Sequence, residues 1–149
     1  MYLVEEGGHR PAQGNLLLAS LPIREQEMIR PLLTRRHLES GARLTPAYED
    51  GGLVYFPETA IVSIGAVATR DAAFGIGMIG CEGVIGWSTL VGGEPYRQHE
   101  TVHLSGGSAL TMDRAAFVAL CSDEPRLLAA ILRFAYLFSL QLADTLVSS

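Results

Sequence analysis

Two histidines could take part in metal chemistry. His99 and His103 lie four residues apart in the stretch HETVH, and Glu100 follows the first of them. On an α-helix this spacing brings both imidazoles to one zinc ion with the glutamate beside them, as in zinc proteases. Whether the stretch has that chemistry therefore depends on the backbone that carries it.

The residues around this stretch favour a β-strand. Pro95 and the pair Gly106-Gly107 leave scarcely two helical turns between them, and Thr101 and Val102 prefer extended backbone. On a strand, side chains two and four residues apart share one face, so Glu100 would point away from both histidines. No further His, Asp or Glu downstream offers a convincing third ligand, and we expect no metal site. A metal-dependent jelly-roll enzyme using the two histidines stays as an alternative.

Composition excludes several classes of protein. The 149 residues are 48% hydrophobic and 18% charged, which predicts one folded domain. The net charge of −5 argues against nucleic-acid binding by this chain alone, because phosphate binding needs a basic face. Two cysteines, Cys81 and Cys121, are too few for a disulfide scaffold or for a cubane iron–sulfur cluster. The N-terminus carries Glu5 and Glu6 where a secretory signal needs positive charge, so we expect a cytoplasmic protein.

The chain begins with an expected flexible tail, 1–14, followed by two short helices. Asn15 and Ser20 are the expected N-caps, and Pro22 suits a first helical turn. Short β-branched or alternating runs then follow to Asp113, separated by glycine and proline. Such runs predict a sandwich, jelly roll or barrel, with flanking helices.

Asp113 is the expected N-cap of a short helix, and a long helix follows within 122–149. The long helix is apolar nearly all round, so it must be covered on two sides. Arg133, Gln141 and Asp144 argue against a free membrane span. We predict that one side packs on the β domain and that the other meets a second copy. The predicted dimer seam, at heptad spacing, consists of Leu128, Ile131, Ala135, Phe138 and Leu142.

The segment Met78–Phe117 carries a family resemblance. It contains a G-x-E-G turn with two hydrophobic residues and a further glycine, a glycine-rich loop, an arginine before a strand, and GGSAL. With VYFP upstream and the terminal helix downstream, it resembles the sensor domain of Crp/Fnr-type transcription regulators. The resemblance covers about 15–149. It implies a cyclic-nucleotide-binding β-roll at 15–121 and a long dimerisation helix at 122–149.

The same resemblance implies a phosphate-binding cassette. In this family a glycine and a glutamate precede a short helix, and an arginine follows. Backbone amides and the arginine hold the phosphate, and the glutamate accepts a hydrogen bond from the ribose. The residues that fall on the cassette are Gly86, Trp87, Ser88, Thr89, Arg97 and Gln98.

Two departures from the cassette predict an altered site. Trp87 stands where the ribose-binding glutamate belongs, and an indole can only donate a hydrogen bond. Arg97 lies one residue out of register, followed by the bulky Gln98. We therefore expect a degenerate cassette that does not bind cyclic AMP with high affinity.

The expected function is a non-enzymatic regulatory sensor domain with an unidentified small-molecule effector. We expect a homodimer through the terminal helix, no membrane insertion, and DNA binding only through a domain outside these residues. Two alternatives remain: the metal-dependent jelly-roll enzyme and a ligand-free dimerisation module.

Overall fold

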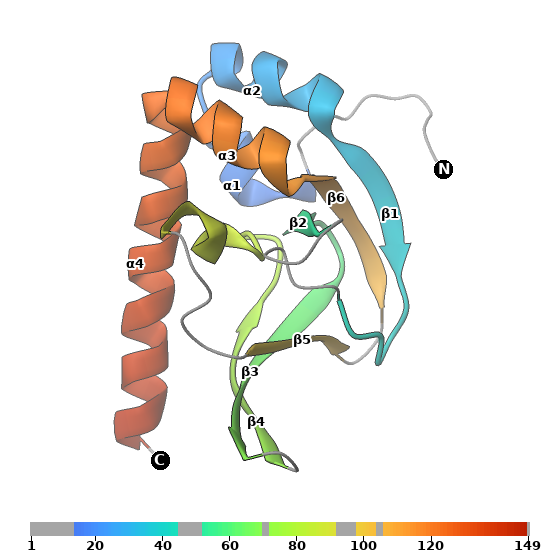
Figure 1. Ribbon diagram of the computed structural model, residues 1–149, viewed down its shortest axis with the longest axis vertical. Helices are drawn as coiled ribbons and strands as arrows, with labels where there is room; N and C mark the ends of the chain where they lie inside the picture. Colours follow the sequence, from blue (N-terminus) through green and yellow to red (C-terminus); the bar gives the residue numbers. More distant parts are fainter. Residues whose placement is uncertain (1–13, 45–51, 70–71, 92–97, 104–105, 149) are drawn as a thin grey trace.

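A computed structural model describes residues 14–44, 52–69, 72–91, 98–103 and 106–148, and within them the side chains of 14–44, 52–64, 77–90 and 106–144. Short helices, a β-roll and a long C-terminal helix follow one another along the chain (Figure 1). The mainly β fold with flanking helices, predicted from the sequence, is confirmed. The expected tail, 1–14, lies outside the described residues except for Gly14.

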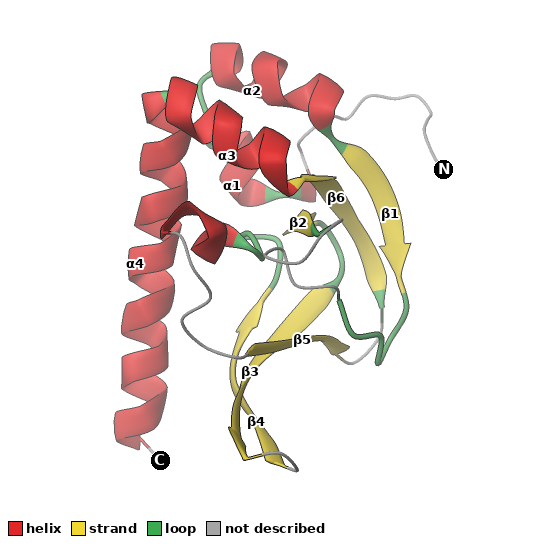
Figure 2. Cartoon of the chain, in the orientation of Figure 1, coloured by secondary structure: helices red, strands yellow, loops and turns green. Residues whose placement is uncertain are grey.

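In the described part of the chain, two three-stranded sheets form the β-roll, and their strand pairs are antiparallel. One sheet has the order β1-β6-β2 and the other β4-β3-β5 (Figure 2). The first comprises β1 (Thr34–Leu38), β6 (Gly107–Asp113) and β2 (Leu53–Pro57). The second comprises β4 (Ala72–Ile79), β3 (Ile61–Thr69) and β5 (Gln98–His103).

The core of the roll lies around β2. Phe56 is fully buried and meets Phe117 edge to face, with ring centroids 6.3 Å apart. The backbones of Tyr55 and Ile85 exchange two hydrogen bonds, of 3.0 and 2.8 Å. This bridge joins the first sheet to the segment that follows β4.

Asn15 anchors the N-terminal helices. Its side-chain oxygen accepts a hydrogen bond from the amide of Leu18 and caps α1 (Leu16–Ala19), as predicted. Its amide nitrogen donates to the carbonyls of Pro57 (2.8 Å) and Gly83 (3.0 Å). One buried side chain thus ties α1 to both the end of β2 and the turn after β4.

The expected role of Ser20 was wrong. Ser20 ends α1 instead of capping the next helix, because its hydroxyl donates back to the carbonyl of Leu17. α2 (Ile23–Ile29) begins after Pro22 without a side-chain cap, and the 3-10 helix η2 (Arg30–Leu32) follows. The fixed φ of proline stabilises this start in place of a cap.

α3 (Arg114–Asp123) and α4 (Pro125–Ser148) complete the fold. Asp113 caps α3 by accepting from the amides of Ala115 and Ala116, as predicted. α4 runs along one side of the β-roll (Figure 1). In length and composition, part of α4, Pro125–Asp144, would suffice to cross a membrane.

An ion cluster holds the start of α4 against α2. Arg24 donates from one nitrogen to Glu25 (3.1 Å) and to Glu124 (2.8 Å), the residue just before α4. Both carboxylates are buried, and the hydrogen bond to Glu124 raises the pKa of Arg24 above its ordinary value. The ion cluster therefore ties the residue just before α4 to α2.

Candidate ligand-binding site

The turn between β4 and the following 3-10 helix is built from glycines and one carboxylate. Glu82 accepts a hydrogen bond from the amide of Gly80 (3.2 Å), and Gly83 donates to the carbonyl of Gly80 (3.2 Å). Val84 and Ile85 then enter the core, fully buried. The side chain of Glu82 thus closes the turn.

Gly86 ends this turn with a φ of 103°, a conformation that residues with a Cβ rarely adopt. The 3-10 helix η3 (Trp87–Val91) begins directly after it. The carbonyl of Gly86 accepts from both the amide (3.2 Å) and the hydroxyl (3.0 Å) of Thr89. The short helix that the cassette resemblance implies is therefore present as η3, and the Thr89 hydroxyl proton is already engaged in it.

η3 is anchored by its two large apolar residues. Trp87 and Leu90 are partly buried and pack against the hydrophobic core. η3 also lies against α3. The indole of Trp87 is therefore part of the packing of the helix.

The remaining cassette residues cannot be placed in the site. Arg97 lies outside the described residues, as does the side chain of Gln98. The backbone of Gln98 begins β5 and pairs with Ala66 of β3. The expected roles of both residues stay predictions.

α4 packs directly on the turn. A Cβ added to Gly83 would collide with the ring of Phe134, so only glycine lets this ring approach. Phe134 stacks on Phe138, with ring centroids 5.8 Å apart. Leu142 and Phe138 pack in turn against Gly77 of β4. The turn that leads into η3 and the long helix therefore share one packed contact.

Solved structures with this arrangement exist. A CooA variant from Carboxydothermus hydrogenoformans has a TM-score of 0.66 at 15% identity, over 96% of this chain and 89% of the other. A cyclic nucleotide-binding domain from Methylobacillus flagellatus has a TM-score of 0.65 at 15% identity, over 90% and 79%. The chain has the cyclic-nucleotide-binding fold.

A regulatory domain of protein kinase A from Toxoplasma gondii, solved with cyclic AMP, shares this fold. Its TM-score is 0.58 at 16% identity, over 73% of this chain and 41% of that one. No protein-family model and no curated protein matches the sequence. The assignment to the cyclic-nucleotide-binding fold thus rests on similarity to solved structures. It agrees with the fold predicted from the order of the sequence motifs.

The predicted dimer seam needs a correction. Ile131, Ala135 and Phe138 are buried within the single chain, so the cyclic-nucleotide-binding fold itself uses them. Leu128 and Leu142 are partly buried and pack against the same core. The residues predicted to meet a partner chain therefore lie on the side of α4 that packs on the β-roll of the same chain.

A different face of α4 is exposed. Its large apolar residues are Leu132, Tyr136, Leu137 and Leu140. The signal that could have separated the faces is Arg133, because a charged residue marks the solvent side of a helix.

The zinc-protease arrangement is absent from β5. HETVH lies in this strand, as predicted, where residues four apart are separated by about 13 Å along the chain. The side chains of His99 and His103 lie outside the described residues. In the described part of the chain, no three His, Cys, Asp or Glu side chains gather to hold a metal ion.

The two cysteines are both free thiols. Cys81 is half-buried, and its carbonyl accepts a hydrogen bond from the amide of Leu16 (2.6 Å). Cys121 is fully buried in α3, and burial raises the pKa of its thiol to about 11. A thiol in that environment stays protonated and unreactive at neutral pH.

Proposed function

We propose that this chain is the regulatory sensor domain of a Crp/Fnr-type transcription regulator and that it catalyses no reaction. The observation that carries the proposal is the turn 80–86, which ends at the positive-φ Gly86 and leads into η3. The fold likeness to CooA and to cyclic nucleotide-binding domains supports it. The effector site lies beside η3, with Ser88, Thr89, Arg97 and Gln98 as its polar residues.

The signal passes from η3 to α4. Phe134 of α4 packs on Gly83, three residues before Gly86, and α3 contacts both η3 and α4. A ligand that binds one position of η3 more tightly than another shifts the population of α4 positions by its difference in binding free energy. A DNA-binding domain joined to α4 would respond to that shift.

The effector differs from cyclic AMP. Trp87 takes the place of the ribose acceptor and is held in the core packing, so no carboxylate is available there for a 2′-hydroxyl. Losing a hydrogen bond to a charged group costs about 1.5–3 kcal/mol, or a factor of ten to more than a hundred in affinity.

Calorimetric titration of the purified chain with cyclic AMP tests this proposal. We expect a dissociation constant above about 100 µM, since most of the specific ribose recognition is absent. Submicromolar binding that is lost in Arg97→Gln would show an intact cassette and contradict the altered site. Arg43→Gln, an exposed arginine on another segment, is the matched control.

The chain forms a homodimer through the exposed face of α4. Leu132 and Tyr136 lie one helical turn apart, and both are large exposed apolar side chains. A Crp/Fnr-type dimer would cover them with the partner's helix. Sedimentation equilibrium is expected to give a dimer for the chain and for Arg43→Glu, and a monomer for Tyr136→Glu. An unchanged dimer in Tyr136→Glu would contradict this face.

DNA contact belongs to a separate domain of the regulator, which acts in the cytoplasm. The 149 residues carry a net charge of −5, which argues against phosphate binding by these residues alone. Fluorescence anisotropy with labelled duplexes is expected to show no sequence-selective binding by these residues. Selective, salt-sensitive binding would contradict the assignment.

A further inference from the structure

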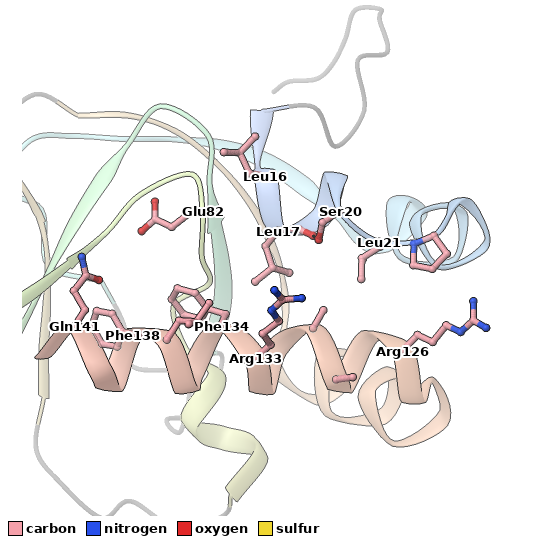
Figure 3. A pocket seen from close by; sticks show the side chains of 14 residues that line it. Leu16, Leu17, Ser20, Leu21, Glu82, Arg126, Arg133, Phe134, Phe138 and Gln141 are labelled. Atoms are coloured by element: carbon pink, nitrogen blue, oxygen red, sulfur yellow. Dashed lines mark hydrogen bonds between the residues drawn. The ribbon is translucent and has the colours of Figure 1, made fainter. Parts of the chain in front are cut away.

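A groove with a volume of about 590 Å³ lies between the N-terminal helices and α4. Figure 3 shows Leu16, Leu17 and Leu21 along one wall, facing Phe134 and Phe138 on α4. Leu137, half-exposed, lies on the same helix and lines the groove as well. The cassette residues whose side chains are described, Gly86, Trp87, Ser88 and Thr89, do not line it, so the groove is separate from η3.

Two arginines give the groove a positive charge. Arg126 and Arg133 both line it, two turns apart on α4, or about 10 Å along the helix. Figure 3 shows Arg133 directed from α4 toward Ser20 on the opposite wall. Within the described residues neither guanidinium has a carboxylate partner, whereas Arg24 and Arg35 are both paired.

The groove carries less negative charge than positive charge. Glu82 is the one carboxylate among the described residues that line the groove, and its side chain accepts a hydrogen bond from the amide of Gly80. A long apolar floor with two free guanidiniums matches a ligand that has one anionic head and an apolar tail. The volume is also in the range of small-molecule sites.

We infer that this groove binds a single-chain amphipathic carboxylate, with its head on Arg133 and its tail between the leucines of α1 and the rings of α4. This second ligand site goes beyond the proposed function. A molecule seated there contacts both the N-terminal helices and α4. It therefore stabilises the position of α4 that the ion cluster at Glu124 also holds.

Isothermal titration of the full chain with decanoate and dodecanoate, below micelle-forming concentrations, tests the inference. We expect one molecule bound per chain. Each added methylene strengthens binding by up to about fourfold, so dodecanoate should bind several times more tightly than decanoate. A cationic amphiphile of equal length, dodecyltrimethylammonium, is expected to bind at least tenfold more weakly.

Variants locate the ligand. Arg133→Gln removes the expected partner of the head and should weaken dodecanoate binding at least tenfold, the equivalent of a charge-assisted hydrogen bond. Leu137→Ser should weaken it through the tail. Arg43→Gln and Leu32→Ser change an exposed arginine and an exposed leucine that line neither the groove nor the proposed dimer face, and both should bind dodecanoate like the unchanged chain.

Three results would overturn the inference. One is no heat of binding with dodecanoate, and another is equal weakening by Leu32→Ser and Leu137→Ser. The third is a groove that a second copy of the chain fills instead of a ligand. In that case Arg133→Gln would leave dodecanoate binding unchanged, and Leu137→Ser would dissociate the dimer. Because the probe and the variants differ from those for η3, failure here leaves the proposed function standing.

Discussion

Two neighbouring aromatic residues on α4 should respond in opposite ways to truncation. Phe138 is 6% exposed and Tyr136 is 63% exposed, although they are two residues apart on one helix. The ring of Phe138 stacks on Phe134 and lies against Gly77 of β4. Phe138→Ala therefore leaves a cavity between α4 and the β-roll, whereas Tyr136→Ala shortens a side chain at the surface.

The size of the first effect follows from the packing. Truncating a buried phenylalanine costs about 3–5 kcal/mol, which includes the cavity, and Gly77 offers no side chain that could fill it. Loss of the stacked pair with Phe134 contributes to the upper part of that range. For a domain of this length, about 3 kcal/mol lowers the melting temperature by roughly 6–12 °C.

Thermal unfolding at several protein concentrations is the assay. Phe138→Ala should lower the melting temperature by the same amount at every concentration. Tyr136→Ala should cost less than about 0.5 kcal/mol in the single chain, and it should reduce the dependence of the melting temperature on concentration. A large, concentration-independent loss for Tyr136→Ala together with a neutral Phe138→Ala would refute the two-faced packing of α4.

Three further predictions concern the packing around the turn and α3. Gly83→Ala should destabilise the fold by about 1–3 kcal/mol because the new Cβ meets Phe134, and Phe134→Leu should recover part of the loss in urea unfolding. Asn15→Ala should cost about 3 kcal/mol or more of stability, because it removes the cap of α1 and leaves two buried carbonyls unpaired. Asn15→Ser should keep the cap but not the bonds to the carbonyls, and should therefore lose less stability. Burial raises the pKa of the Cys121 thiol to about 11 from 9.0, so the unfolded chain releases this proton at lower pH than the folded chain, and stability should fall between about pH 9 and 11. The fall should be smaller in Cys121→Ala. Identical plots of stability against pH for the two proteins would contradict the burial effect.

Local chemistry accounts for the parts of the fold that the sequence predicts. Asn15 and Asp113 cap their helices because a short polar side chain at that position can accept from amides within the next three residues. Val102 and its neighbours form a strand because β-branched residues prefer extended backbone. The turn at Gly86 was also recognisable, since its φ requires glycine.

Contacts between distant segments account for the rest. α4 is apolar nearly all round, so spacing alone offered two stripes and could not say which one meets the β-roll. The choice depends on Gly77 and Gly83, which are more than fifty residues away and admit Phe138 and Phe134. The groove of Arg133 depends equally on how α1 packs beside α4, which no local pattern encodes.

The position after Gly86 distinguishes this chain from a binder of cyclic AMP, and restoring its acidic residue is the most direct test. The melting temperatures of the chain and of Trp87→Glu should be measured with cyclic AMP, cyclic GMP and cyclic dinucleotides. A ligand at a hundred times its dissociation constant adds about 2.7 kcal/mol, or roughly 5–10 °C for this length. We expect no shift with cyclic AMP for the unchanged chain and a measurable shift for Trp87→Glu. A shift of 5–10 °C with cyclic AMP in the unchanged chain would contradict the altered site.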